Sequence, residues 1–209
     1  MLAALLALAL AAPVPSSRHF PSLQGGDTLG AGSSVAAFSA GFTMVSAGWA
    51  QALSDGADAG ALLEFDVAST ELVVGGLYRQ IAWRSGDLAV SWRAKGGFYA
   101  DFGSTWVHDA NQSDAGVRAT PGLAASTQTG RGLLSLGVDV PFTFTFSRGG
   151  GFALGVLGAI SFETPLWGDL SAGARVGGGA LWSYSGAPFA SDSPRALVDI
   201  AALLTYRIF

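Results

Sequence analysis

Residues 133–146 read LLSLGVDVPFTFTF, and this stretch decides the fold class. Every even position carries a large apolar side chain: Leu134, Leu136, Val138, Val140, Phe142, Phe144 and Phe146. The odd positions include small or polar residues: Ser135, Gly137, Asp139, Thr143 and Thr145. Successive side chains of a β-strand point to opposite faces, so this period of two predicts a long strand with one apolar and one polar face.

Two other segments repeat the alternation. In the first, Leu88, Val90, Trp92 and Phe98 alternate with Ser91, Arg93, Lys95 and Tyr99. In the last, Val198, Ile200, Ala202, Leu204, Tyr206 and Ile208 alternate with Asp199, Thr205 and Arg207. These stretches exceed the about 5 to 6 residues of an average globular strand, and they provide the about 9 to 11 residues that a tilted membrane strand needs.

The composition favours an apolar environment around the protein. Half of the 209 residues are hydrophobic, and only 12% are charged. A soluble domain carries about 25% charged residues, so this chain has too few charges to cover a water-facing surface. A membrane would supply the apolar surroundings, and a soluble barrel or sandwich is the alternative. The net charge of -4 and the absence of a Lys/Arg cluster argue against a nucleic-acid partner.

Turn signals divide the chain into ten predicted strands. They cover 28–38, 41–52, 58–69, 71–84, 87–101, 114–126, 132–146, 151–163, 167–183 and 195–209. An even number is typical of single-chain bacterial barrels, in which both termini lie at one end and the long connections at the other. Eight strands are the alternative, because 114–126 alternates weakly around Pro121 and one early segment could also fail.

The first residues predict an export signal. An apolar run extends from Leu2 to Ala12, which is the length of a signal-peptide core and too short for a spanning helix. Ala9-Leu10-Ala11 offers a small-x-small processing site, and a short buried helix is the alternative interpretation. We therefore expect a signal peptide at 1–12, a flexible leader at 13–27 and a barrel at 28–209.

With these features the chain resembles the small bacterial outer-membrane β-barrel proteins, over its whole mature length. The resemblance implies an all-β, antiparallel, transmembrane up-and-down barrel in the bacterial outer membrane, surrounded by outer-membrane lipid and lipopolysaccharide. The last residues are Thr205-Tyr206-Arg207-Ile208-Phe209. Tyr206 and the terminal Phe209 resemble the signal that the barrel-assembly machinery recognises, although Arg207 occupies a position that is usually aromatic or apolar in such signals.

Residues for catalysis or metal binding are few. Because Cys is absent and His108 is the one usable His, neither a metal site nor a cofactor is expected. His108-Asp109 beside Ser104 and Ser113 suggests a hydrolytic group of a membrane enzyme. Adjacent residues on a loop are not a placed triad, so we favour a solvated polar loop and no enzymatic activity. Asp55 and Asp58 are expected to end a hairpin rather than to hold a cation.

The inner face is predicted to carry a balanced set of charges. Its members are Glu64, Asp66, Asp139 and Asp199 together with Arg93, Lys95, Arg175 and Arg207. Equal numbers of acids and bases suggest ion pairs across a narrow interior, whereas a selective pore would favour one sign. The sequence thus leaves two functions open, a structural or surface element and a narrow passive channel for small solutes, with a lipid-modifying or proteolytic barrel enzyme as the alternative.

Arg79 is ambiguous in this scheme. Its odd-numbered neighbours are expected to face lipid, whereas Gln80 is expected to point inward; these neighbours are Val73, Leu77, Ile81 and Trp83. A β-bulge, or an arginine reaching toward the membrane edge, would reconcile these expectations.

Overall fold

The structure is a computed structural model that describes residues 22–67, 70–103, 113–130, 132–146, 151–185 and 195–208. It contains eleven strand segments: β1 (Ser34–Gly41), β2 (Met44–Ser54), β3 (Ala57–Asp66), β4 (Glu71–Ser85), β5 (Leu88–Asp101), β6 (Asp114–Thr129), β7 (Gly132–Asp139), β8 (Phe142–Thr145), β9 (Gly151–Trp167), β10 (Leu170–Ser185) and β11 (Arg195–Arg207). Each pairs antiparallel with its neighbours, and β11 closes the sheet onto β1.

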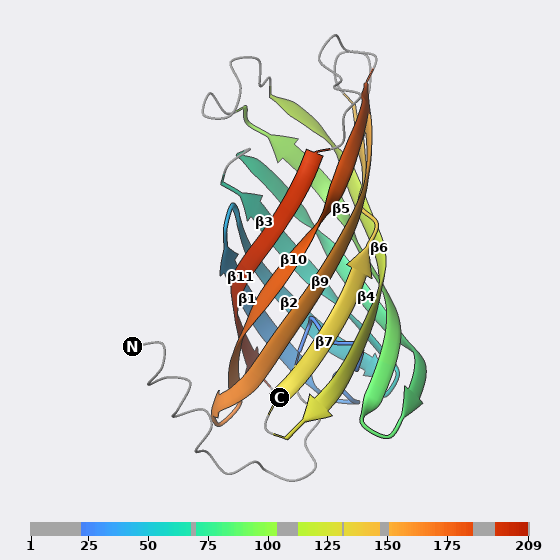
Figure 1. Cartoon of the computed structure of the whole chain (residues 1–209), viewed down its shortest axis with the longest axis vertical. Coiled ribbons are helices and arrows are strands. Elements are labelled where there is room, and N and C mark those ends of the chain that lie inside the picture. Colours follow the sequence, from blue (N-terminus) through green and yellow to red (C-terminus); the bar gives the residue numbers. More distant parts are fainter. Residues whose placement is uncertain are drawn as a thin grey trace.

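β7 and β8 are two parts of one strand. Both pair with β6 on one side and with β9 on the other, in a continuous register. The break falls at Val140 and Pro141, because proline has no backbone N–H to donate to the ladder. The predicted all-β, antiparallel, up-and-down barrel of ten strands is therefore confirmed, and the alternative of eight strands is wrong (Figure 1).

The two ends of the barrel differ in their connections. Four short turns follow β2, β4, β6 and β9, and β1 begins and β11 ends on the same side. Gly86 and Gly168 have φ of 56° and 54° in two of these turns, a left-handed conformation that suits glycine. We call this side the turn end, which is at the bottom of Figure 1, and the opposite side the loop end.

The alternation separates an apolar outside from a polar inside. On β5, Phe98 is 69% exposed on the outer face, whereas its neighbour Tyr99 is 5% exposed and points inward. On β7, Leu136 and Val138 are exposed and Ser135 is buried. The face assignments made from residues 88–99 and 133–146 are thus correct.

β4 departs from the expected faces. Val73 and Arg79 are buried on the inner side, and Val74 is exposed on the outer side. The expectation that Val73 and Leu77 face outward is therefore wrong. The register shifts between Ile81 and Trp83, which marks the bulge that the sequence suggested. One extra residue reverses the phase of the alternation, so Trp83 lies outside although Arg79 lies inside.

The chain before β1 lies within the barrel at the turn end. β1 starts at Ser34 rather than at residue 28, and Ser22, Thr28 and Leu29 are buried. Leu29 packs in a small apolar core with Val35. Residues 22–27, which the sequence analysis assigned to the leader, thus contact the interior of the barrel. Within the described part of the chain, no helix is long and apolar enough to cross a membrane.

Candidate functional site

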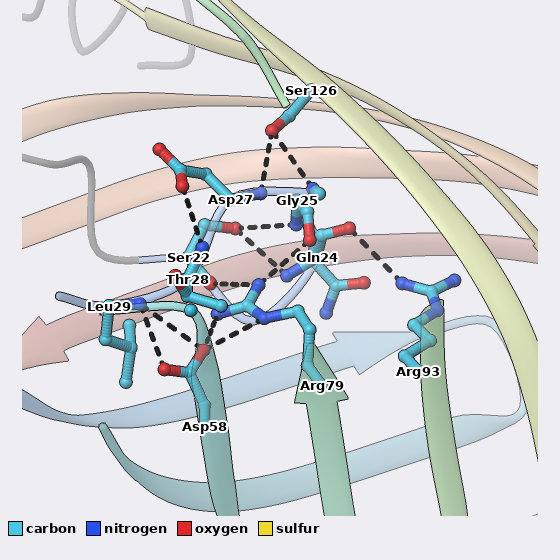
Figure 2. A network of polar contacts seen from close by, with 12 residues as sticks. Ser22, Gln24, Gly25, Asp27, Thr28, Leu29, Asp58, Arg79, Arg93 and Ser126 are labelled. Carbon is cyan, nitrogen blue, oxygen red and sulfur yellow. Dashed lines mark hydrogen bonds and ion pairs between the residues drawn. The ribbon is translucent and has the colours of Figure 1, made fainter. Parts of the chain in front are cut away.

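The turn end of the lumen is filled by residues 22–29, which we call the plug. Its backbone N–H groups bind inward-facing side chains of the wall: Gly26 and Asp27 donate to Ser126 Oγ on β6, at 3.0 and 3.1 Å. On the other side of the lumen, Leu29 N donates to Asp58 on β3 at 3.1 Å. Figure 2 shows the plug crossing the interior between these strands. The plug therefore takes its backbone partners from strands that lie apart in the sheet.

Arg79 and Asp58 form the central anchor of the plug. Arg79 Nη2 lies 2.5 Å from Asp58 Oδ2, and the two side chains are 3% and 0% exposed. Arg79 Nη1 also donates to the carbonyl oxygens of Ser22 and Gly25, both at 2.9 Å (Figure 2). A buried ion pair is tolerated when hydrogen bonds satisfy its remaining polar atoms, and the plug carbonyls provide them.

A third buried ionisable side chain joins the plug to the opposite wall. Glu163 on β9 is 1% exposed. It accepts a hydrogen bond from Ser22 Oγ of the plug and another, at 3.2 Å, from Thr205 Oγ1 on β11. The sequence did not single out Glu163, because the strand predicted at 151–163 ended there; β9 continues to Trp167.

Two arginine pairs lie where the plug meets the rest of the lumen. Arg93 donates to both carboxylate oxygens of Asp139, at 2.9 and 2.8 Å, and to Gln24 O of the plug at 3.2 Å. Arg175 Nε lies 2.6 Å from Asp199 Oδ2, and its Nη1 donates to Gln24 Oε1 at 3.0 Å. Gln24 is thus held from two sides of the barrel.

Beyond Gln24 the lumen is hollow. The cavity has a volume of about 760 Å³, and its lining extends from Gln24 to Phe42 and Thr43 in the β1–β2 connection at the loop end. Phe42 is 69% exposed, so the wall of the cavity reaches the surface there. We call this cavity the chamber. Its volume falls within the about 300 to 1,000 Å³ of small-molecule sites.

Further ion pairs lie on the chamber wall. Lys95 Nζ is 3.8 Å from Glu64 Oε1, and Arg118 Nη2 is 2.5 Å from Glu71 Oε1. Next to the second pair, an acidic row crosses β3 to β6: the register places Asp66 opposite Glu71, Glu71 opposite Asp101 and Asp101 opposite Asp114.

Of the eight lumen charges that the sequence predicts, the structure brings six together as ion pairs. They are Glu64 with Lys95, Asp139 with Arg93 and Asp199 with Arg175. Asp66 lines the chamber, whereas Arg207 lies at the turn end, away from it. Sequence reasoning missed Glu71 and Arg118. The alternation within the predicted strand 114–126 could have placed Arg118 inside, whereas Glu71 belongs to the odd positions of 71–84, which were expected to face lipid.

The other predicted residues have separate places. Asp55 and Asp58 both hold the plug: the carbonyl oxygen of Asp55 accepts from Thr28 Oγ1 at 2.8 Å, and Asp58 Oδ1 accepts from Leu29 N at 3.1 Å. Tyr206 is 52% exposed on the outer face of β11. Phe209 of the assembly signal lies outside the described residues, as do Ser104, His108 and Asp109. Among the residues that the structure describes, no group of three or more His, Cys, Asp or Glu side chains could hold a metal ion.

Comparison of the chain with models of known protein families and with curated proteins found no match. The function of the protein is therefore inferred from the barrel and its interior.

Proposed function

We propose that the protein is an outer-membrane β-barrel whose own N-terminal segment closes the lumen, so that it acts as a structural or surface element and not as an open channel. The plug carries this proposal, because Ser22 to Leu29 fill the turn end and bind six strands of the wall. In the membrane, the turn end faces the periplasm, because both ends of the barrel chain lie there.

The outer surface supports a membrane location. Large apolar side chains are exposed on nearly every strand, among them Phe38, Val74, Phe98, Leu136 and Ile200. Such a surface is unfavourable in water and favourable in lipid. On this proposal, outer-membrane lipid and lipopolysaccharide cover the barrel, the barrel-assembly machinery inserts it, and it catalyses no reaction.

The interior favours closure over conduction. A passive path would have to cross the level of Arg79 and Asp58, whose side chains are buried against the plug. Removing the plug would expose these charges together with Glu163. An open pore would keep its charges solvated. The barrel therefore conducts only if the plug is displaced.

Membrane fractionation and a planar bilayer test this proposal. We expect the protein in the outer-membrane fraction, with a gel mobility that changes on boiling, and no steady current through the purified barrel. A matched variant, in which a Gly/Ser sequence of equal length replaces residues 22–29, should conduct. Soluble protein in the periplasm would refute the location, and equal currents from both proteins would refute the plug.

A further inference from the structure

The chamber has a floor and a mouth. Gln24 of the plug, held by Arg93 and Arg175, forms the floor. Phe42 and Thr43 belong to the opposite end of the lining. Among the described residues, the chamber is thus open toward the loop end and is closed at the turn end while the plug is in place. This geometry is that of a binding pocket, and it depends on the closed lumen proposed above.

The charges of the lining favour a cation. The described acids are Glu64, Asp66, Glu71, Asp101, Asp139 and Asp199, and the described bases are Arg93, Lys95, Arg118 and Arg175. Each of these four bases lies within 4.0 Å of a carboxylate. An anionic ligand would have to displace one of these carboxylates, whereas a cation benefits from the excess of negative charge.

Three of the six described acids lie together on one wall of the chamber near the mouth. Asp66 and Asp101 lie on either side of Glu71 in the acidic row, at the loop end of β3 and β5. Carboxylates lining a low-dielectric cleft raise the local concentration of cations. A positively charged group is therefore expected at this wall.

The facing wall carries apolar side chains on the loop-end side of Arg175 and Asp199. Leu157, Leu181 and Leu197 line the chamber from β9, β10 and β11. In a closed sheet these strands lie across the lumen from β4 and β5. Apolar side chains facing a row of acids suit a ligand with an apolar group on one side and a positive charge on the other.

We infer that the chamber binds a small organic cation with an apolar body, such as a substituted amine. The cationic group lies against Asp66, Glu71 and Asp101, and the apolar body lies against Leu181 and Leu197. Arg93 and Arg175 stay with their carboxylates and hold Gln24, the floor, without contacting the charge of the ligand.

Calorimetric titration of the purified barrel in detergent micelles with benzyltrimethylammonium tests this site, with protein-free micelles as the blank. We expect saturable binding that weakens as salt is added. Tetramethylammonium, which lacks the apolar body, and phenylmethanesulfonate, which reverses the charge, should each bind at least about tenfold more weakly, because each loses one wall of the site. Saturable binding of phenylmethanesulfonate with equal or higher affinity would overturn the inference.

A matched pair of variants locates the site. Asp101→Asn keeps an oxygen that can accept from Gly103 N and removes one charge from the acidic row, so we expect binding about fivefold weaker. Asp87→Asn removes a charge from the exposed β4–β5 turn and should change binding less than twofold. Leu197→Ser should lower the affinity for benzyltrimethylammonium until it is close to the affinity for tetramethylammonium, because the variant loses an apolar contact with the benzyl group. Equal losses in Asp101→Asn and Asp87→Asn would overturn the site.

Boiling-dependent gel mobility identifies the variants that fold, and current measurements on the same preparations separate the two proposals. A non-conducting barrel that does not bind benzyltrimethylammonium would refute the site and leave the plugged barrel intact. A conducting wild-type barrel that still binds it would refute the closed lumen and leave the site intact.

Discussion

The two ends of the barrel interior contain the same kind of ion pair in different surroundings. At the turn end, Arg79 and Asp58 approach to 2.5 Å and are 3% and 0% exposed. At the loop end, Arg118 and Glu71 also approach to 2.5 Å but are 27% and 15% exposed. The N–O distance therefore does not distinguish the pairs, whereas burial does. Loss of one partner leaves an uncompensated buried charge in the first case and a charge that water can reach in the second.

The difference assigns separate tasks to the two ends. Arg79 Nη1 donates to the carbonyl oxygens of Ser22 and Gly25, so the buried ion pair and the plug stabilise each other. Arg118 instead borders the chamber and reaches Thr143 Oγ1 at 3.3 Å. The turn end thus holds the plug, whereas the loop end lines the chamber.

The largest effect is expected from Arg79→Ala. It leaves Asp58 buried without its cation and frees two plug carbonyls, so the free energy of unfolding should fall by about 3 to 5 kcal/mol. Denaturant unfolding followed by tryptophan fluorescence measures this loss. Arg84→Ala is the control, because Arg84 pairs with Asp27 of the plug at an exposed position and should change little. Equal losses in the two variants would mean that burial does not separate the pairs.

A slightly smaller effect is expected on the outer face. Leu136 is 55% exposed there, and Leu136→Arg should cost about 2 to 4 kcal/mol if lipid surrounds it near mid-span. Thr143→Ser, on the inner face, keeps the hydroxyl that accepts from Arg118 Nε and should be mild. Unfolding in lipid vesicles provides the comparison. If both variants unfold alike, the outer face does not contact lipid, and the barrel would be a soluble one.

Arg93→Ala and Arg175→Ala test the border between the two ends. Their side chains are 9% and 11% exposed, between the values of the other pairs. Loss of these charged hydrogen bonds should cost about 1.5 to 3 kcal/mol each. The current should stay absent, because Arg79 and Asp58 still hold the plug. Unchanged stability together with a cation-selective current would show instead that the lumen is open.

The strands could be predicted because each one shows a local alternation of apolar and polar residues. The strand predicted at 132–146 matches β7 and β8, and the one predicted at 87–101 matches β5 within a residue. The inner face of β4 could not be predicted in the same way. The alternation of inward and outward side chains changes phase at the bulge between Ile81 and Trp83. The sequence alone does not show which residues, those before the bulge or those after it, have their odd positions inside.

The plug could not be predicted because its position depends on distant contacts. Residues 22–29 show no alternation of apolar and polar residues. Their hydrogen-bond partners Ser126 and Glu163 lie about 100 and 141 residues away in the sequence. A segment rich in Gly and Ser is locally indistinguishable from a linker, and only the closed wall supplies partners for its backbone. Asp58 shows the same limit: it ends a hairpin, as predicted, and also binds Arg79 and the plug.

The smallest effect is expected from Arg118→Ala, the counterpart of Arg79→Ala at the loop end. The free energy of unfolding should fall by about 1 kcal/mol or less, because the chamber allows water to solvate Glu71 once its partner is gone. The same unfolding measurement applies, and the ratio of the two losses measures the contrast between the ends. A loss as large as that of Arg79→Ala would place Glu71 in an environment as dry as that of Asp58, and the chamber would then not be a solvated space.

Arg118→Ala also has a consequence of the opposite sign for the chamber. It removes the cation that offsets Glu71, so the row of Asp66, Glu71 and Asp101 gains one net negative charge. Benzyltrimethylammonium should therefore bind more tightly to this variant, by about threefold to tenfold, and the gain should shrink as salt is added. Calorimetric titration against wild type measures it. Weaker binding would mean that Arg118 itself contacts the ligand, for which an anionic group would then be the better partner.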